Sequence, residues 1–209
     1  MPPSVHQEWR YTTPHPRGGA IKKTNTSGRL GRAVPYFTRA DFAAIGFQKF
    51  CPIGQGGYGL VYRVNGTKGT AVLKVFKESH PDTEDGISRD CLRELAMLRT
   101  CAHPQVVALQ RVVQLGNHVA AVLESLHTSL FHHYNRRTMK QVNRLILAAD
   151  MASGLAQLVR MGVMHRDLKP QNILVSENGR AKLADFGQSR LWAPDRSFTL
   201  WVCTLWYRA

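Results

Sequence analysis

The side chains with the clearest chemical potential lie between residues 165 and 187. Asp167 is followed five positions later by Asn172, and Asp185 opens an Asp-Phe-Gly triplet. A positioned carboxylate can accept the proton of a hydroxyl group, and carboxamide and carboxylate oxygens are ligands that suit a magnesium ion. The pattern therefore predicts proton abstraction from a hydroxyl group beside a bound metal ion.

A glycine-rich segment lies earlier in the chain, where residues 54–59 read Gly-Gln-Gly-Gly-Tyr-Gly. Glycines at this spacing let backbone amides approach phosphate oxygens, because no Cβ atom stands in the way. Taken alone, the pattern is also typical of a plain turn. A dinucleotide-binding fingerprint needs a helix to begin at the third glycine, whereas a strand is predicted after Gly59. The Gly-Lys-Ser/Thr of a Walker A loop is absent.

Lys74 and Glu94 form a second candidate pair, twenty residues apart. Lys74 lies in a predicted strand and Glu94 in a predicted helix. A lysine held by a helix glutamate can present its ammonium group to two phosphates of a nucleotide. Taken alone, the two residues indicate no more than a surface lysine and a surface glutamate.

Together these groups form a long, ordered constellation: the glycine-rich segment, Lys74, Glu94, the His-Arg-Asp of residues 165–167 and the Asp-Phe-Gly of residues 185–187. The sequence resembles the eukaryotic protein kinases, from about Phe47 to the last residue. The resemblance implies transfer of a phosphoryl group from ATP, with Mg²⁺ as cofactor, to hydroxyl groups of protein substrates.

The resemblance also implies a role for each of these positions. Asp167 would orient and deprotonate the substrate hydroxyl, and Lys169, which is typical of the serine/threonine class, would steady the transferring phosphate. Asn172 and Asp185 would hold magnesium. The implied ATP-binding residues come from the loop, the strands and the hinge, where the backbone meets the adenine edge: Gly54, Gln55, Gly56, Gly57, Gly59, Val61, Val72, Lys74, Glu94, Glu124, Leu126 and Leu174.

Residues 204–209 narrow the resemblance to the cyclin-dependent kinases. This likeness implies transfer to Ser or Thr before proline, and a cyclin-like activator that contacts the helix around residues 86–94. It implies an activating phosphorylation site at Thr199 and an inhibitory one at Tyr58. Because arginine donates two hydrogen bonds to phosphate at once, a clamp for the first site is expected at Arg93, Arg166 and Arg190.

Three features depart from the family pattern. Val72 stands where alanine is usual, and Gln188 stands where an apolar residue is usual. The sequence ends at Ala209, the first residue of the Ala-Pro-Glu motif, so we expect an incomplete large lobe that exposes apolar faces. This leaves open a different function, in which a catalytically incompetent kinase-derived fragment acts as a nucleotide- or partner-binding module.

The elements that must position these side chains follow from hydrophobic patterns. Short β-branched runs predict strands at residues 60–64 and 71–76, joined by a turn at Asn65-Gly66. Further strands are predicted at 118–126, 173–175 and 181–183.

Apolar residues at three- and four-residue steps predict two helices, at residues 88–99 and 141–161. Leu92, Leu95 and Leu98 lie on one stripe of the first helix, and the apolar residues at these steps in the second are Val142, Leu145, Ile146, Ala149, Leu155 and Leu158. Strands that precede helices indicate an α+β fold. With the resemblance, we expect a two-lobed protein-kinase-like fold with a small lobe at about 45–126 and a partial large lobe at 127–209.

Composition limits the remaining possibilities. The 209 residues are 44% apolar with a net charge of +14, and residues 1–40 predict a basic flexible arm before a kinase domain at 41–209. Binding of nucleic acid by this arm is a further alternative, but no recognition motif indicates a specific nucleic-acid partner. No run approaches the roughly 18 apolar residues of a membrane span, so we expect no membrane association. Four widely spaced cysteines indicate neither a zinc site nor a disulfide framework, which favours an intracellular location in cytoplasm or nucleus.

Overall fold

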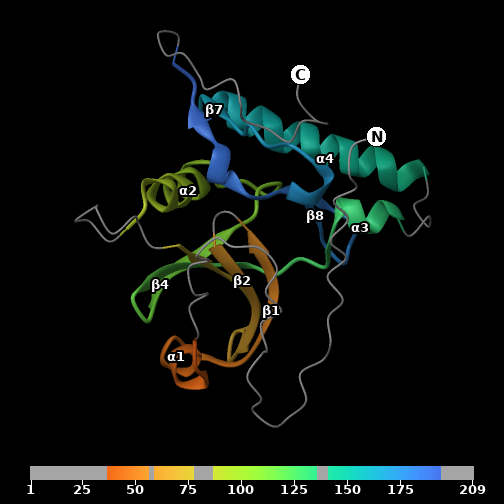
Figure 1. Ribbon diagram of the computed structural model, residues 1–209. Coiled ribbons are helices and arrows are strands. Elements are labelled where there is room, and N and C mark those ends of the chain that lie inside the picture. Colours follow the sequence, from red (N-terminus) through yellow and green to blue (C-terminus); the bar gives the residue numbers. More distant parts are fainter. Residues whose placement is uncertain (1–36, 57–58, 78–86, 136–140, 194–209) are drawn as a thin grey trace, which may run out of the picture. The chain divides into compact units, whose positions relative to one another are not determined.

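The computed structural model describes residues 37–56, 59–77, 87–135 and 141–193 (Figure 1). The chain divides into two units, Met1–Pro35 and Tyr36–Ala209, and all described residues belong to the second unit. Nearly all of the predicted basic arm therefore lies outside the described residues. Among the helices that the structure describes, none is both long and apolar enough to cross a membrane.

The small lobe is built on one antiparallel sheet with the strand order β1-β2-β3-β5-β4. Its strands are β1 (Phe47–Gly56), β2 (Gly59–Gly66), β3 (Gly69–Phe76), β4 (Leu109–Leu115) and β5 (His118–Glu124). β3 is the central strand, and its last four residues are all buried. A strand covered on both faces is expected to be continuously apolar, so Lys74, the one charged residue of β3, stands out.

The hairpin between β2 and β3 turns two residues later than predicted. Gly66 pairs with Gly69, so Thr67 and Lys68 form the turn. A Cβ atom on Gly66 would lie 2.3 Å from the carbonyl oxygen of Gly46. Glycine is therefore required here by the close approach of two backbones and not by the turn itself.

A short helix, α1 (Arg39–Ala44), precedes the sheet and packs on β1. Thr38 caps it, because its hydroxyl accepts from the Asp41 amide at 3.3 Å while the Asp41 carboxylate accepts from the Thr38 amide at 2.7 Å. The ring of Phe42 is fully buried and stacks on Phe50 with 3.8 Å between centroids. Regular structure thus begins slightly before residue 41, the boundary expected from the sequence.

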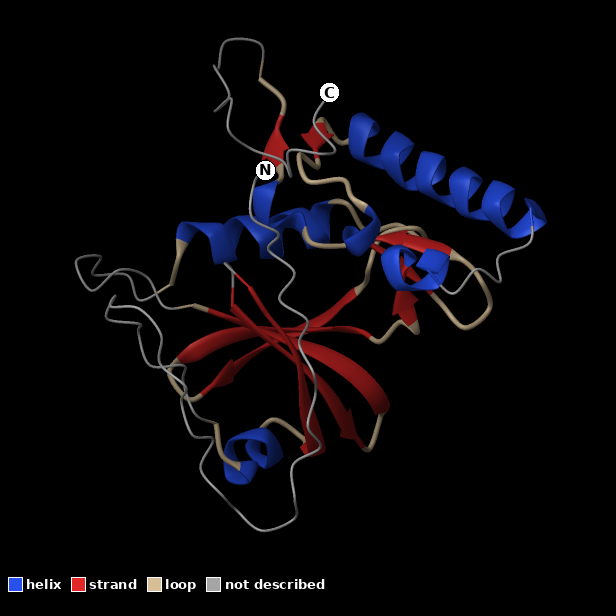
Figure 2. Cartoon of the chain, turned by 45° about the vertical axis from the view of Figure 1, so that its right-hand side comes forward, coloured by secondary structure: helices blue, strands red, loops and turns tan. Residues whose placement is uncertain are grey.

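Helix α2 (Arg89–Thr100) matches the predicted helix closely, and Ser88 caps it by accepting from the Cys91 amide at 3.1 Å. Its buried stripe differs from the predicted one: Leu92 is 55% exposed, whereas Glu94 is 2% exposed. The buried residues Cys91, Glu94, Met97 and Leu98 recur at helical spacing. The helix packs against β4 and against η2 (Phe186–Gln188), and it lies directly above the sheet in Figure 2.

The described part of the large lobe combines two helices with short strands. The helices are α3 (Leu130–Asn135) and α4 (Gln141–Arg160). β6 (Thr128–Ser129), β8 (Ile173–Val175) and β9 (Ala181–Leu183) form a three-stranded antiparallel sheet, while β7 (Val163–Met164) pairs with β10 (Arg190–Leu191). A 3-10 turn, η1 (Pro170–Asn172), precedes β8. The predicted strands at 173–175 and 181–183 are confirmed at the same bounds.

Helix α4 is present where predicted, and only part of its apolar pattern is buried. Leu145 is 67% exposed and Ile146 is 40% exposed, whereas Leu147 is 3% exposed. Ala149 is also exposed, while Leu155 is partly buried and Leu158 is buried as predicted. The reason is a buried carboxylate: Asp150 accepts from the Arg180 Nε at 2.9 Å and from the Ala181 amide at 2.9 Å, which turns its side of the helix toward β9.

Candidate active site

Lys74 joins the two lobes at the centre of the site. Its Nζ donates to Glu94 Oε1 at 2.6 Å and to Asp185 Oδ1 at 2.9 Å. β3 supplies the lysine, α2 supplies the glutamate, and the loop before η2 supplies the aspartate. The structure therefore brings together three residues that are 20 and 111 positions apart in sequence.

The electrostatics favour the charged forms of Lys74 and Asp185, whereas burial raises the pKa of Glu94. Burial lowers the pKa of Lys74, but the carboxylates of Glu94 and Asp185 outweigh burial and hold that pKa above its ordinary value. Burial raises the pKa of Asp185, but the Lys74 ammonium lowers this pKa by a larger amount, so the net shift is downward. An ammonium and an ionised carboxylate thus face one another where a nucleotide phosphate and its metal ion would need them.

Asp167 lies in a second cluster, on the loop between β7 and η1. Its Oδ2 accepts from Lys169 Nζ at 2.7 Å and from Asn172 Nδ2 at 2.9 Å. The same Asn172 amide nitrogen donates to the backbone carbonyl of Asp167 at 2.9 Å. The aspartate is therefore fixed by two residues that the sequence predicted to act beside it.

The backbone is strained on both sides of this site. Arg166 (φ 67°) and Asp185 (φ 63°) are the two residues other than glycine with positive φ among the described residues. Such conformations cost about 1–3 kcal/mol each and persist only where the surroundings enforce them. Here they aim the neighbouring Asp167 and Asp185 itself, so the strain supports a functional role for both loops.

His165 and Phe186 connect the two loops. His165 Nε2 lies 3.0 Å from the Ala184 carbonyl oxygen, and its ring centroid lies 5.0 Å from that of Phe186. Phe186 is fully buried in a core cluster with Leu98 of α2, against which Leu109 packs. The fold thus couples α2, which carries Glu94, to the loop that carries Asp185.

The glycines of the glycine-rich segment differ in whether the fold itself requires a glycine at that position. Gly59 (φ 150°) admits no side chain, because a Cβ atom would lie 1.9 Å from the Val75 carbonyl oxygen. At Gly54 a Cβ atom would meet only Val61 Cβ, at an ordinary 3.8 Å. The fold therefore requires glycine at 59 but not at 54, and close approach of a ligand at Gly54 stays a prediction. Gln55 is exposed and Gly56 ends β1, whereas Gly57 and Tyr58 lie outside the described residues.

The predicted adenine-lining residues come from both lobes. Val61 pairs with Lys74, and Val72 of β3 pairs with Leu123 of β5. Because paired residues and alternate residues of a strand share a face, Val61, Val72 and Lys74 lie on one face of the sheet. Leu174 belongs to β8 of the large lobe, and Glu124 and Leu126 lie at and just after the end of β5.

Sequence reasoning missed what the Glu124 side chain does. Its carboxylate accepts from Lys182 Nζ at 2.6 and 2.8 Å and from the Ala108 amide at 2.7 Å. Asp150 and its partner Arg180 were missed in the same way. The partners are 58 and 30 residues apart respectively, so no local pattern marks them.

The predicted phosphothreonine clamp is only partly described. Arg93 Nη1 donates to Asp90 Oδ1 within its own helix at 2.6 Å, and Arg190 Nη1 donates to the Ser189 carbonyl at 2.9 Å. Arg166 lies on the strained loop beside Asp167. Thr199 lies outside the described residues, so the clamp stays a prediction. Gln188 ends η2 and is partly buried.

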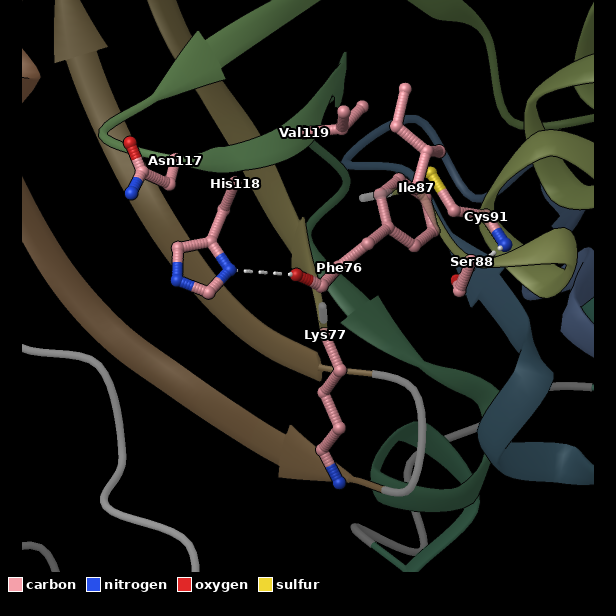
Figure 3. A pocket seen from close by; sticks show the side chains of 8 residues that line it. All are labelled: Phe76, Lys77, Ile87, Ser88, Cys91, Asn117, His118 and Val119. Carbon is pink, nitrogen blue, oxygen red and sulfur yellow. Dashed lines mark hydrogen bonds between the residues drawn. The ribbon is translucent and has the colours of Figure 1, made fainter. Parts of the chain in front are cut away.

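A small hollow lies apart from these clusters, where the start of α2 meets the sheet (Figure 3). The lining residues are Phe76, Lys77, Ile87, Ser88, Cys91, Asn117, His118 and Val119. Burial, reinforced by Glu94, raises the pKa of the Cys91 thiol to about 11, so the thiol is protonated and unreactive at neutral pH. The hollow includes none of the predicted catalytic side chains, and the site is therefore defined by the polar clusters.

The donor set fits magnesium better than a transition metal. In the described ranges, no group of three or more His, Cys, Asp or Glu side chains is placed to hold a metal ion. Asp185 offers an ionised carboxylate, and Asn172, whose amide nitrogen is held by Asp167, offers its carbonyl oxygen. Magnesium is commonly bound by one or two protein oxygens together with water and substrate phosphates.

Comparison with known proteins agrees with this geometry. The protein kinase domain family matches residues 47–209. Cyclin-dependent kinase 10 of Rattus norvegicus and of Homo sapiens are each 35% identical to the chain over 171 residues. Each alignment covers 78% of this chain and 47% of the relative, so the chain spans about half the length of these curated relatives. The chain therefore belongs to the protein kinase domain family, and within it the chain is similar to a cyclin-dependent kinase.

Proposed function

We propose that the protein transfers the γ-phosphoryl group of ATP to serine or threonine hydroxyls of protein substrates. The observation that carries the proposal is the Lys74 ammonium, which bridges Glu94 of the small lobe and Asp185 of the large lobe at 2.6 and 2.9 Å. A phosphoryl-transfer site needs a fixed cation beside a metal-binding carboxylate.

Each residue then has a task that its surroundings support. Asp167 orients the substrate hydroxyl and accepts its proton, and Asn172 holds the Asp167 carboxylate in place. Lys169, 2.7 Å from that carboxylate, steadies negative charge on the transferring group. Lys74 binds the α- and β-phosphates. Positioning and electrostatics of this kind supply most of the catalysis in phosphoryl transfer.

Asn172 and Asp185 would hold Mg²⁺. The ion supplies positive charge that offsets the negative charge of the phosphates. Asp185 suits this task because the Lys74 ammonium keeps its pKa below the ordinary value despite burial. The adenine end of ATP lies between Val61 and Val72 of the small lobe and Leu174 of the large lobe, against the backbone of the hinge at 124–126.

Regulation follows the cyclin-dependent kinases in this proposal. Phosphorylated Thr199 accepts from Arg93, Arg166 and Arg190, and a cyclin-like activator contacts α2. The ion pair between Arg93 and Asp90 at 2.6 Å is exposed on the Asp90 side, so it exchanges for a phosphate at little cost. Phosphorylation of Tyr58 inhibits the kinase activity. The preferred target is a Ser or Thr that precedes proline, and the protein works inside the cell, in cytoplasm or nucleus.

Peptide phosphorylation by the purified chain tests the proposal. We expect transfer from radiolabelled ATP to Ser-Pro and Thr-Pro peptides, with less transfer to Ser-Ala and none to Tyr-Pro peptides. Lys74→Met and Asp167→Asn should each reduce the rate by roughly 100-fold or more. Lys49→Met, at an exposed position of β1, is the matched control and should retain full activity.

The same peptide assay distinguishes a kinase from a second candidate function, a nucleotide- or partner-binding module without catalysis. The exposed apolar side chains of α4, including Leu145 at 67% and Val159 at 75% exposure, favour this candidate because such faces mark interaction surfaces. Binding of a fluorescent ADP analogue without any peptide transfer would support the module. Activity retained by Asp167→Asn would refute the proposed kinase mechanism.

A further inference from the structure

The carboxylate of Glu124 ties three segments of the chain together. Oε1 accepts from Lys182 Nζ at 2.6 Å and from the Ala108 amide at 2.7 Å, and Oε2 accepts from Lys182 Nζ at 2.8 Å. The side chains of Lys182 and Glu124 are 20% and 23% exposed, respectively. A bidentate, mostly buried ion pair has a fixed geometry, unlike an exposed pair.

Two of the three segments belong to the small lobe and one belongs to the large lobe. Glu124 ends β5 of the small-lobe sheet, Ala108 precedes β4, and Lys182 is the middle residue of β9 in the large lobe. The backbone joins the same segments, because the Glu124 amide donates to the Ala108 carbonyl at 3.1 Å. The carboxylate therefore lies where the chain passes from one lobe to the other.

A second set of backbone bonds fixes β9 against the small lobe. The Val107 amide donates to the Leu183 carbonyl at 2.9 Å, and the Leu183 amide donates to the Gln105 carbonyl at 2.8 Å. β9 then runs directly into Asp185, whose carboxylate meets Lys74. The position of β9 thus fixes the distance between the hinge and the carboxylate that faces the phosphates.

We infer that Lys182 and Glu124 are positioning residues that set the distance between the adenine end and the phosphate end of the nucleotide site. This inference rests on the proposed function, since it assigns the pair a part in nucleotide binding. Neither side chain touches the reacting groups. Their bond holds the hinge backbone after β5 and the strand that carries Asp185 in one relative position.

This inference predicts that breaking the ion pair between Lys182 and Glu124 weakens nucleotide binding but leaves the rate of phosphoryl transfer nearly unchanged. Lys182→Met keeps the aliphatic stem and leaves the Glu124 carboxylate without its cation. We expect the Kd of a fluorescent ADP analogue and the KM for ATP to rise by about three- to thirtyfold, which lies within the range of measured pair couplings. The kcat should stay within about twofold, and Lys182→Arg should restore wild-type binding.

A double-mutant cycle isolates the pair. Glu124→Gln keeps an oxygen that can accept from the Ala108 amide but removes the charge. After Lys182→Met, the further change Glu124→Gln should cost little, because the two substitutions break the same bond. Lys68→Met is the matched control, since it makes the same chemical change at an exposed turn position and should leave Kd and KM unchanged.

Hydrogen–deuterium exchange of the nucleotide-free chain tests the bond independently of the proposed function. Lys182→Met should speed exchange at the Ala108 and Leu183 amides, and Lys68→Met should not. If the wild-type chain binds nucleotide and Lys182→Met binds it equally well, the positioning role is wrong while the proposed function stands. If the wild-type chain binds no nucleotide, the proposed function and the positioning role both fail. A lower melting temperature with unchanged Kd and KM would show a purely structural bond and would also overturn the inference.

Discussion

Three glycines of the small-lobe sheet allow the requirements of the fold to be separated from those of a ligand. Gly59 has φ 150° and a backbone oxygen 1.9 Å from the site of a Cβ atom, whereas Gly69 has φ 95° and open space around that site. At Gly54 a Cβ atom makes one ordinary contact at 3.8 Å, and φ is not positive. Substitution by alanine should therefore have three different effects.

The magnitudes follow from these contacts. Gly54→Ala should stabilise the chain by about 0.5 kcal/mol, because alanine loses less backbone entropy on folding than glycine does. Gly69→Ala should cost about 1 kcal/mol, from strain alone. Gly59→Ala should cost roughly 2–4 kcal/mol, since strain is added to an overlap that only a backbone shift of β2 against β3 can relieve.

Urea unfolding followed by circular dichroism gives the free energy of unfolding of each variant, and titration with a fluorescent ADP analogue gives its Kd. Gly54→Ala should weaken nucleotide binding although its stability is unimpaired, because in the proposed function the added methyl group would lie where the phosphates approach. Gly69→Ala should bind normally. The reasoning is refuted if Gly59→Ala is as stable as Gly69→Ala, or if Gly54→Ala binds nucleotide as tightly as the wild-type chain.

The remaining predictions concern the large lobe. Gly154→Ala should lower the free energy of unfolding by about 1 kcal/mol, because a Cβ atom would lie 3.0 Å from the Gln105 carbonyl oxygen; a gain in urea stability, as at an ordinary helix glycine, would contradict this. Burial holds the pKa of His165 below its ordinary 6.5, so the unfolded chain binds a proton that the folded chain does not. Stability should therefore fall below pH 6.5 by up to about 1.4 kcal/mol per pH unit, and His165→Phe should remove this share of the pH dependence in melts at pH 7.5 and 5.5; an unchanged slope would count against it. The double substitution Leu145→Glu with Val159→Lys should raise the highest concentration at which light scattering finds the chain monomeric, without changing its melting temperature. If the variant aggregates at the same concentration as the wild-type chain, the exposed apolar face of α4 does not cause the aggregation.

Much of the site could be predicted from sequence because its residues act in short segments with fixed local geometry. One short loop carries the Asp-Phe-Gly of 185–187, and another carries both Asp167 and Asn172. In the structure, Asn172 Nδ2 lies 2.9 Å from Asp167 Oδ2. Lys74, by contrast, indicated no more than a surface lysine when taken alone. The pairing of Lys74 with Glu94 was expected from the family resemblance, whereas the contact of Lys74 with Asp185 was not predicted, since no spacing rule relates residues 111 positions apart.

The buried face of α4 could not be predicted, for a physical reason. Its sequence is apolar over much of its circumference, so a 3.6-residue period fits more than one face. The choice is made by Asp150, whose burial requires Arg180 from the turn before β9 and the amide of Ala181, the first residue of β9. A charged residue on a helix normally indicates the solvent side, and only its distant partner reverses that expectation.

The position of Glu94, on which the Lys74 bridge depends, is held mainly by apolar packing and not by ionic attraction. A buried ion pair gains little net free energy, because the Coulomb attraction is offset by desolvation of both charges. On the same helix, Cys91, Met97 and Leu98 are buried at 1%, 8% and 4% exposure, and full burial of a Met or Leu side chain contributes about 1.5–3 kcal/mol. Met97 and Leu98 share their core cluster with Phe186, so the same packing that holds α2 in place also fixes the loop that carries Asp185. It follows that a partner that shifts α2 would change the catalytic cluster by moving this core, and the Lys74–Glu94 distance would report the shift.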